Sequence, residues 1–345
     1  MTRPTVIDIA REAGVSLATV DRVLNARPGV REKTIAAVND AIARIGYVRD
    51  MAAANLARGR THRVAILLPD TESQFVQTLA DALTEAAVLA QAARMQVELH
   101  RFPAEDMHGL AMLLQELQQG GISGVALMAP ETPVVRDAVR ALQAAGVPVV
   151  AMVSDLPNSG PDHYVGIDSR AAGRTAAVLM GRFLGAKLPR VMVIANSMLL
   201  RESIERRRGF DEIMLRDFPG VEVGQTLETH GAPDALRQVM REALASGGPV
   251  GGIYLLGTGH RALAASLSEL GLLGRVVTIG HELTPHTFGA LQAGWLDAVI
   301  AQNAGHVARS TLRVLQAKAD QQPINESQER LRIEIILREN LPHSL

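Results

Sequence analysis

The sequence predicts a small all-α head followed by an α/β body that folds as two doubly wound parallel-sheet lobes. Three observations support this fold class. The first 63 residues hold three short helical patterns separated by turn residues. The rest of the chain alternates strand-length apolar runs with amphipathic helices, which is typical of parallel sheets covered on both faces. The 345-residue length leaves about 280 residues for the body, enough for two lobes.

The composition excludes several function classes. The chain has no cysteine, which excludes disulfides, thiolate zinc sites, iron–sulfur clusters and cysteine nucleophiles. Its 47% hydrophobic content and balanced charge exclude disorder throughout. The N-terminus has no signal-peptide core, and the longest apolar runs are far shorter than the roughly 20 residues of a membrane span. We therefore expect a soluble cytoplasmic protein without a membrane partner.

The charge is unevenly distributed along the chain. Residues 1–63 carry 11 Lys+Arg and 6 Asp+Glu, a net charge of +5, whereas the remaining residues carry 24 and 30, a net charge of −6. A small basic module joined to a large acidic one favours a polyanionic partner at the N-terminal end.

The head has the pattern of three helices. Thr5 can cap a helix over 6–13 that ends at Gly14, and Ser16 can cap a second helix over 17–24. A third helix, about 32–45, begins near Arg31 and ends at Gly46. A helix, a three-residue turn and a second helix form the helix-turn-helix arrangement, which presents the start of its second helix to a DNA major groove. The core residues expected are Val6, Ile9, Ala10, Ala13, Val20, Val23, Leu24, Ile35, Val38, Ile42 and Ile45.

The head also resembles a known family. The run 5–25, TVIDIAREAGVSLATVDRVLN, is similar to the start of lactose-repressor (LacI/GalR) family regulators, and the likeness continues through Val30, Thr34, the corner 45–47 and the run 52–57. The resemblance implies a sequence-specific DNA-binding transcriptional regulator, most simply a repressor. Its partners would be operator DNA, a small-molecule effector and a second copy of the chain, as a homodimer or within a tetramer.

The resemblance assigns DNA contacts to individual residues. Positions that read base edges fall on Leu17, Ala18 and Arg22; Arg22 can donate two hydrogen bonds to a guanine, whereas the two apolar side chains can touch thymine methyl groups. Asp21 stands where the family usually has serine, and a carboxylate there is repelled by phosphate. Contacts that position the head on the DNA backbone are expected at Thr5, Ser16, Thr19, Asn25 and Arg31.

Residues 50–63 are interpreted as a hinge helix and linker between a head at 1–49 and a body at 64–345. The helix-prone stretch 50–57 is too short to be stable alone. In the family it folds when two copies pair over the operator, and an apolar side chain then wedges into the minor groove. Leu56 stands at that position. The alternative is a linker whose Leu56 packs on the body.

The body resembles the periplasmic-binding-protein-like body of the same family. That fold crosses between its lobes three times and binds a small ligand between them, at the carboxyl ends of strands. We expect a first lobe at about 64–168 and 290–327 and a second at about 169–289 and 328–345. Strands are predicted at 64–68, 97–102, 125–128, 147–153, 191–195, 221–227, 253–256, 276–279 and 296–300.

Strand ends together with the resemblance give the effector contacts. Arg206 aligns with the arginine that binds ligand hydroxyls or a carboxylate in the family. Glu282 aligns with the family's ligand-binding aspartate, and Gln302 aligns with a glutamine at a strand end. Thr258 and Gly259 stand where relatives have Asn-Asp. The effector would be a sugar, a polyol or a sugar acid. The full predicted set is Ser73, Phe75, Glu131, Asp155, Arg206, Thr258, Glu282 and Gln302.

Two motifs suggest enzymes instead. The run 257–262 fits the dinucleotide fingerprint GxGxxA, with Glu282 about 20 residues further on as a ribose-binding acid. The run 281–286 is weakly similar to the zinc-binding motif HExxH. Its histidines are five residues apart and Pro285 would break a helix, so they cannot share the helix face that a zinc site needs. We therefore expect no enzymatic activity, no cofactor and no metal. The alternatives are a small-solute binding protein and an NAD-dependent oxidoreductase.

Overall fold

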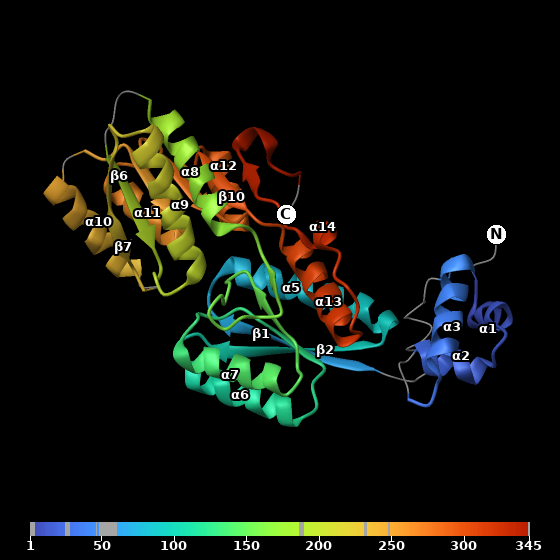
Figure 1. Ribbon diagram of the computed structural model, residues 1–345. Coiled ribbons are helices and arrows are strands. Elements are labelled where there is room, and N and C mark those ends of the chain that lie inside the picture. The colour runs from blue at the N-terminus through green and yellow to red at the C-terminus, as the bar shows by residue number, and fades with distance from the viewer. Residues whose placement is uncertain are drawn as a thin grey trace. The chain divides into compact units, whose positions relative to one another are not determined.

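The computed structural model describes residues 4–24, 28–45, 47, 61–185, 190–230, 233–247 and 249–343. The chain divides into two compact units, residues 1–60 and 61–345, which are described separately (Figure 1). Two predicted DNA contacts, Asn25 and Leu56, lie outside the described residues, as does most of the predicted hinge and linker.

The head consists of α1 (Val6–Ala13), α2 (Leu17–Leu24) and α3 (Glu32–Ile45), which confirms the three predicted helices. Gly14 ends α1 with a φ of 66°, a left-handed conformation that glycine adopts without steric cost. The Ser16 Oγ accepts a hydrogen bond from the Thr19 N–H, 3.2 Å from its nitrogen, and so caps α2. Short-range capping therefore fixes the turn between α1 and α2.

The core of the head is small. Ile9, Val20, Val38 and Ala41 are buried, and most of the other predicted core residues pack around them, partly buried. The prediction is wrong for Val6 and Ile35, which are 40% and 37% exposed. Both lie in the first turn of their helices, where a helix end has fewer neighbours.

The first lobe of the body is a five-stranded parallel sheet with the strand order β2-β1-β3-β4-β5. Along β1, Val64, Ile66 and Leu68 pack into one core cluster and Ala65 and Leu67 into another, because successive side chains of a strand point to opposite faces. The strands are β1 (His62–Asp70), β2 (Met95–Pro103), β3 (Gly124–Leu127), β4 (Val149–Met152) and β5 (His163–Val165).

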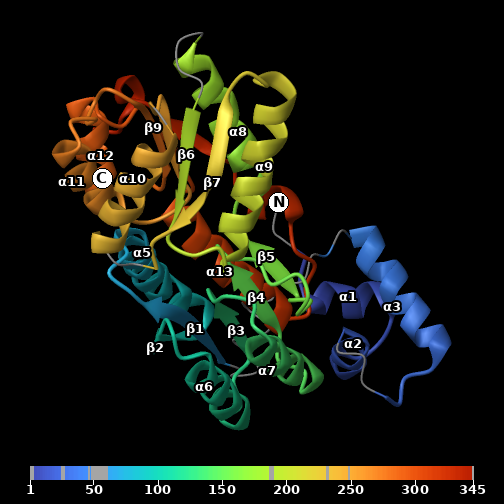
Figure 2. The same cartoon turned by 90° about the vertical axis from the view of Figure 1, so that its left-hand side faces the viewer.

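Helices cover both faces of this sheet. Figure 2 shows α6 and α7 on one side of it and α5 and α13 on the other. The side chains of Ser73, Asp106 and Thr132 cap the first turns of α5, α6 and α7. The helices are α5 (Gln74–Ala90), followed by the turn η1 (Gln91–Ala93), α6 (Met107–Gln119), α7 (Pro133–Ala144) and α13 (Ala304–Ala319).

The second lobe is a six-stranded sheet with the order β11-β10-β9-β8-β6-β7, in which only β11 runs antiparallel to its neighbour. The helices α8 and α9 pack on one face and α10, α11 and α12 on the other. The strands are β6 (Arg190–Ala195), β7 (Glu222–Glu228), β8 (Gly252–Leu255), β9 (Val277–His281), β10 (Ala298–Ala301) and β11 (Glu334–Ile336). The helices are α8 (Ser169–Leu184), α9 (Arg201–Asp217), α10 (Pro233–Gly247), α11 (His260–Glu269) and α12 (Pro285–Ala293), with the short turns α14 (Glu326–Glu329) and η2 (Arg338–Asn340) near the C-terminus.

The chain crosses between the lobes at 166–168, 302–303 and 320–333. The sequence assigned residues 290–301 to the first lobe, and this is wrong, because β10 pairs with β9 in the second sheet. An apolar run does not reveal which of two sheets it joins, since its pairing partner is distant in sequence. All nine predicted strands are present among the described residues, and β5 and β11 are additional. No helix in the described ranges is long and apolar enough to span a bilayer.

Candidate functional site

The start of α2 forms an exposed surface on the head. Ser16, Leu17, Ala18 and Arg22 are all exposed, including the apolar Leu17 at 50%. Arg22 forms no ion pair with any residue that the structure describes. Its guanidinium is therefore free to donate two hydrogen bonds to a base edge.

Of the predicted phosphate-contact residues, Thr5, Ser16, Thr19 and Arg31 are described by the structure, and hydrogen bonds at the surface of the head hold the first three. The Ser16 Oγ lies 2.9 Å from the Thr19 Oγ1, and the Thr5 Oγ1 donates to the Asp8 carboxylate at 2.7 Å. Hydrogen bonds from Thr5 lower the pKa of Asp8. Arg31 is exposed at the start of α3. The hydrogen bonds at the starts of α1 and α2 therefore also hold the side chains of Thr5, Ser16 and Thr19, which are expected to contact DNA phosphates.

In the second lobe, three neighbouring strands end side by side. The strands β8, β9 and β10 are adjacent and parallel, and Leu256, Glu282 and Gln302 directly follow them. Open α/β sheets bind ligands at the carboxyl ends of their strands. Arg206 reaches the same edge from α9.

Arg206, Glu282 and Gln302 form one hydrogen-bonded group, called here the Arg206 cluster. The Arg206 Nη2 donates to the Glu282 Oε1 (3.2 Å), and the Gln302 Nε2 donates to the same oxygen (3.1 Å). The Arg206 Nη1 donates to the Leu256 carbonyl (2.7 Å). The three side chains are buried. Burial raises the pKa of Glu282, and the interactions with Arg206 and Gln302 offset only part of that rise.

Two glycines determine where Arg206 lies. A Cβ atom on Gly173 of α8 would clash with the Arg206 carbonyl, and a Cβ atom on Gly209 of α9 would clash with the Arg170 carbonyl. The backbones of α8 and α9 therefore approach more closely than any side chain would permit. This approach buries one face of α9, which carries Glu202, Ser203, Arg206, Gly209, Phe210, Ile213 and Met214.

Glu282 has a strained backbone. Its φ is 67°, in the left-handed region that residues other than glycine seldom adopt. The Glu282 N–H donates to the Ile300 carbonyl (3.0 Å), and the Thr287 hydroxyl donates to the Glu282 carbonyl (2.8 Å). Strain of this kind persists where surrounding contacts enforce it, and it is concentrated at functional sites.

Several polar atoms at this edge are buried without a hydrogen-bond partner among the described residues. They include the Arg206 Nε, the Gln302 Oε1 and the Glu202 Oε2. Each unpaired buried polar group costs about 1–3 kcal/mol, so a set of them in one place indicates a position for a polar ligand. The sequence prediction missed Glu202. Its spacing four residues before Arg206, on the same helix face, is the signal that could have found it.

Aromatic residues support the cluster from within the second lobe. The Tyr254 hydroxyl and the His281 Nε2 are 2.8 Å apart, and the Tyr254 ring stacks on Phe210 with 4.5 Å between centroids. Burial, followed by the charge of Arg206, holds the pKa of His281 well below its usual value. His281 is therefore neutral at pH 7.

The first lobe contributes Tyr164 and Asp155 to the same region. The Tyr164 hydroxyl lies 3.0 Å from the Val153 carbonyl, a hydrogen-bond acceptor that follows β4. Burial raises the pKa of Tyr164, and the carboxylates of Glu202, Asp155 and Glu282 raise it further, against the charge of Arg206. Charges from both lobes therefore surround this hydroxyl. Burial also raises the pKa of Asp155.

The other four predicted effector contacts have different surroundings. Ser73 caps α5, and Phe75 packs in the core of the first lobe with 7% exposure. Both oxygens of Glu131 accept hydrogen bonds from the loop 158–159. Thr258 is exposed in the turn before α11. None of the four belongs to the Arg206 cluster; as ligand contacts they stay predictions.

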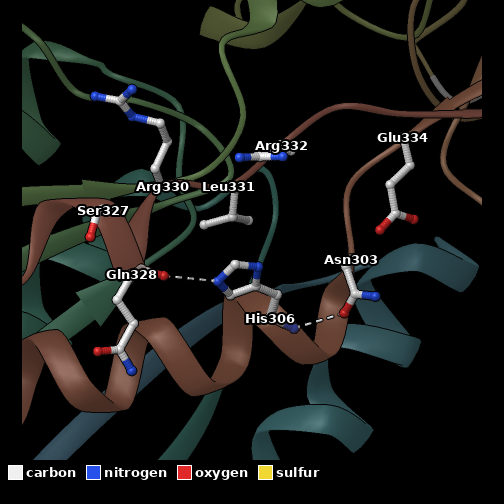
Figure 3. Close-up of a pocket in the computed structure, with 8 residues that line it drawn as sticks. All are labelled: Asn303, His306, Ser327, Gln328, Arg330, Leu331, Arg332 and Glu334. Carbon is white, nitrogen blue, oxygen red and sulfur yellow. Dashed lines mark hydrogen bonds between the residues drawn. The ribbon is translucent and has the colours of Figure 1, made fainter.

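A separate pocket of about 320 Å³ lies between the start of α13 and the segment 327–334 (Figure 3). The His306 Nε2 is 3.3 Å from the Gln328 carbonyl, and the His306 N–H donates to the Asn303 side chain (2.8 Å). Arg330 and Arg332 at its rim are exposed. Because its polar side chains are not buried, this pocket lacks the convergent buried groups of a small-molecule site.

The two enzyme-like motifs have structural explanations. Gly259, with a φ of 115°, forms the turn between β8 and α11. Glu282, the candidate ribose-binding acid, accepts hydrogen bonds from Arg206 and Gln302 as a member of the Arg206 cluster. His281 ends β9 and His286 lies in the first turn of α12, so the two histidines belong to different elements.

Comparisons with known proteins agree with this architecture. Residues 64–323 match the family model of the periplasmic binding protein domain, and residues 5–50 match that of bacterial regulatory proteins of the lacI family. Catabolite control protein A of Priestia megaterium is 31% identical over 150 residues, 44% of this chain and 43% of that protein. The HTH-type transcriptional regulator GntR of Pseudomonas aeruginosa is 28% identical over 225 residues, 64% of this chain and 62% of that protein. The alignments thus span between two fifths and two thirds of these relatives.

Solved structures match the body. A glucose-galactose binding protein from Geobacillus stearothermophilus has a TM-score of 0.73 at 16% identity, with 82% of this chain and 99% of that chain covered. A solute-binding protein from Burkholderia graminis in complex with D-arabinose has a TM-score of 0.72 at 19% identity, with 81% and 96% covered. At these identities the likeness shows the fold.

The fold and the strand-end cluster define a two-lobe protein of the periplasmic-binding-protein class, joined to a helix-turn-helix head. The chain belongs, over residues 64–323, to the periplasmic binding protein domain family, and its residues 5–50 form a DNA-binding domain of the lacI type. Its curated relatives are transcriptional regulators rather than enzymes.

Proposed function

We propose that the protein is a sequence-specific DNA-binding transcriptional regulator, acting as a repressor, whose operator affinity changes when a small hydroxyl-bearing metabolite binds at the Arg206 cluster. It would act in the cytoplasm as a homodimer on an operator of two half-sites. One observation carries the proposal: a single chain joins an exposed helix-turn-helix surface to a buried strand-end cluster with unpaired polar atoms. The regulators and sugar-binding proteins among its relatives support it.

The DNA-binding half of the proposal depends on Arg22. Arg22→Ala should cost about 1–3 kcal/mol on the preferred site and relax base choice at one position, because a bidentate contact to guanine discriminates between bases. The site would first be selected from random DNA, and binding then measured by fluorescence anisotropy on specific and random duplexes. Equal weakening on both would remove the base-reading role.

A route for coupling to the head exists within the body. Gln302 of the Arg206 cluster is followed by α13, and at the far end of α13 the Asp320 Oδ1 lies 2.9 Å from the His62 Nε2. His62 begins β1, the first strand after the head and its linker. A ligand that moves the strand ends can therefore bias the head through a rigid helix about 24 Å long.

The deciding test of the proposal is an operator titration with and without ligands drawn from a thermal-shift screen of sugars, polyols and sugar acids. Ligand and operator must change each other's affinity by the same factor, typically about 5–150-fold. A chain that binds ligand but no DNA would be a small-solute binding protein instead, and one that binds DNA identically with every screened ligand would not respond to metabolites of this class.

A further inference from the structure

Glu202 is a buried carboxylate that the proposed regulatory function does not explain. It lies in the first turn of α9 with 7% of its surface exposed. It forms no ion pair with any described residue, and its Oε2 atom is buried without a hydrogen-bond partner. An ionised carboxylate in such a place destabilises the fold unless something pairs with it.

The surroundings of Glu202 carry an excess of negative charge. The carboxylates of Glu202, Asp155 and Glu282 all act on the Tyr164 hydroxyl, and Arg206 is the cation that opposes them there. Arg201, which lies near Asp155, is already paired with Glu205 at 2.7 Å. At the Tyr164 hydroxyl, one arginine therefore opposes three carboxylates.

Two of the unpaired atoms at this edge are carbonyl or carboxylate oxygens. Glu202 Oε2 and Gln302 Oε1 need hydrogen-bond donors, and the Arg206 Nε is an unpaired donor beside them. Each Nη atom of Arg206 donates one of its N–H groups, Nη2 to Glu282 and Nη1 to the Leu256 carbonyl. A ligand carboxylate would meet three like charges opposed by one arginine, whereas hydroxyl or ammonium groups would satisfy the unpaired acceptors without that repulsion.

We propose that Glu202 is the specificity-determining residue of the effector site, and that it selects an uncharged or amino-bearing polyhydroxylated ligand and excludes sugar acids. The inference rests on the proposed function and narrows it, because it removes one of the three ligand classes considered there. Glu202 would accept hydrogen bonds from the ligand's hydroxyl or ammonium group, and ligand binding would supply the partner that the carboxylate lacks.

Two thermal-shift measurements on the full chain test this inference. Without ligand, Glu202→Gln should raise the unfolding midpoint by about 2–4 °C, since it removes an unpaired buried charge. The second measurement uses three matched probe series: glucose, galactose and mannose, each with its 2-amino sugar and its uronic acid. The wild type should respond to neutral or amino sugars and to no uronate, and Glu202→Gln should weaken the best response at least about tenfold in affinity.

Glu205→Gln is the matched control on the same helix. Glu205 pairs with Arg201 at 2.7 Å and Arg208 at 3.0 Å, so its loss should lower the midpoint slightly and leave the probe response unchanged. A uronate as the best wild-type probe would overturn the role of Glu202 while leaving the proposed effector response intact. A lowered midpoint with an unchanged probe response in Glu202→Gln would make Glu202 a structural residue. If no probe shifts the wild type, the sugar-responsive function fails, and this inference with it.

Discussion

The two lobes have the same layered architecture, but their strand ends are used differently. In the second lobe, Glu282 accepts hydrogen bonds from Gln302 and from Arg206, and buried polar atoms of the cluster remain unpaired. In the first lobe, Ser73 caps a helix, and Glu131 accepts hydrogen bonds from the neighbouring loop 158–159. The residues that follow the second lobe's strands are thus available to a ligand, whereas those of the first lobe mostly maintain the fold.

This difference shows that position at a strand end does not by itself make a binding residue. The two sets differ in whether a side chain finds hydrogen-bond partners for its polar atoms within the protein. Glu131 accepts from the Ser159 backbone N–H (2.7 Å) and hydroxyl (3.0 Å), so it gains nothing from a ligand. Glu202 and Gln302 keep unpaired oxygens. We therefore expect ligand chemistry to be set by the second lobe.

The largest expected effect comes from Gly209→Ala. The new Cβ atom would clash with the backbone carbonyl of Arg170, which cannot move aside cheaply, so α8 and α9 must separate. We expect a loss of about 3 kcal/mol or more in the free energy of unfolding, measured by urea denaturation, together with loss of ligand binding. Gly220→Ala is the control, since nothing lies within 4 Å of the added atom there. Equal stability of the two variants would refute the close approach of α8 and α9.

Lowering the pH should lower the free energy of unfolding of the second lobe, because its buried histidines resist protonation in the folded state. Burial, with a contribution from the charge of His286, lowers the pKa of His260 to about 3. Between pH 6.5 and 3 the unfolded chain binds a proton there that the folded chain does not, so the free energy of unfolding falls as the pH falls. His260 alone should cost about 2 kcal/mol at pH 5 relative to pH 7.

Glu282 acts in the opposite direction, because its raised pKa lets the folded state bind a proton as the pH falls. The histidine contribution is therefore isolated by comparing wild type with His260→Leu at pH 7 and pH 5. Trp295, the single tryptophan, packs beside the core of the second lobe and reports its unfolding by fluorescence. Identical pH dependence in the two proteins would argue against a buried neutral His260.

The smallest effect on ligand binding is expected in the first lobe. Glu131→Ala removes three hydrogen bonds to Asn158 and Ser159 and should cost about 1–3 kcal/mol in stability. Its ligand affinity, measured by calorimetry, should stay within about twofold of wild type. A tenfold loss of affinity would mean that Glu131 contacts the ligand and that the two lobes share the recognition.

Local signals explain which parts of the fold the sequence could predict. The head helices match their predicted limits, because Thr5, Gly14 and Ser16 start or stop them through contacts a few residues away. The strands β5 and β11 were missed, since three-residue strands are defined by the neighbours with which they pair. The assignment of β10 to the wrong lobe has the same cause.

The site was predictable in part for a similar reason. Glu282 and Gln302 directly follow apolar strands, so their placement at the carboxyl edge could be inferred from the alternating pattern. Glu202 was missed, because the start of α9 has the composition of a solvated charged helix, and the spacing of four residues from Arg206 indicates only that the two side chains share a helix face. The packing of α9 against α8, at Gly173 and Gly209, determines which charged side chains of α9 point inward. This contact joins parts of the chain that are distant in sequence, so a local pattern does not reveal it.

Whether the Arg206 cluster senses the effector can be decided by titrating the operator with Arg206→Ala in the presence and absence of the best ligand from the screen. Gln302→Leu, which removes a smaller part of the cluster, serves as a second variant should Arg206→Ala fold poorly. We predict that operator affinity without ligand stays within about twofold of wild type, while the ligand-induced change, about 5–150-fold in wild type, disappears. A variant that folds and still responds to ligand as the wild type does would contradict the account.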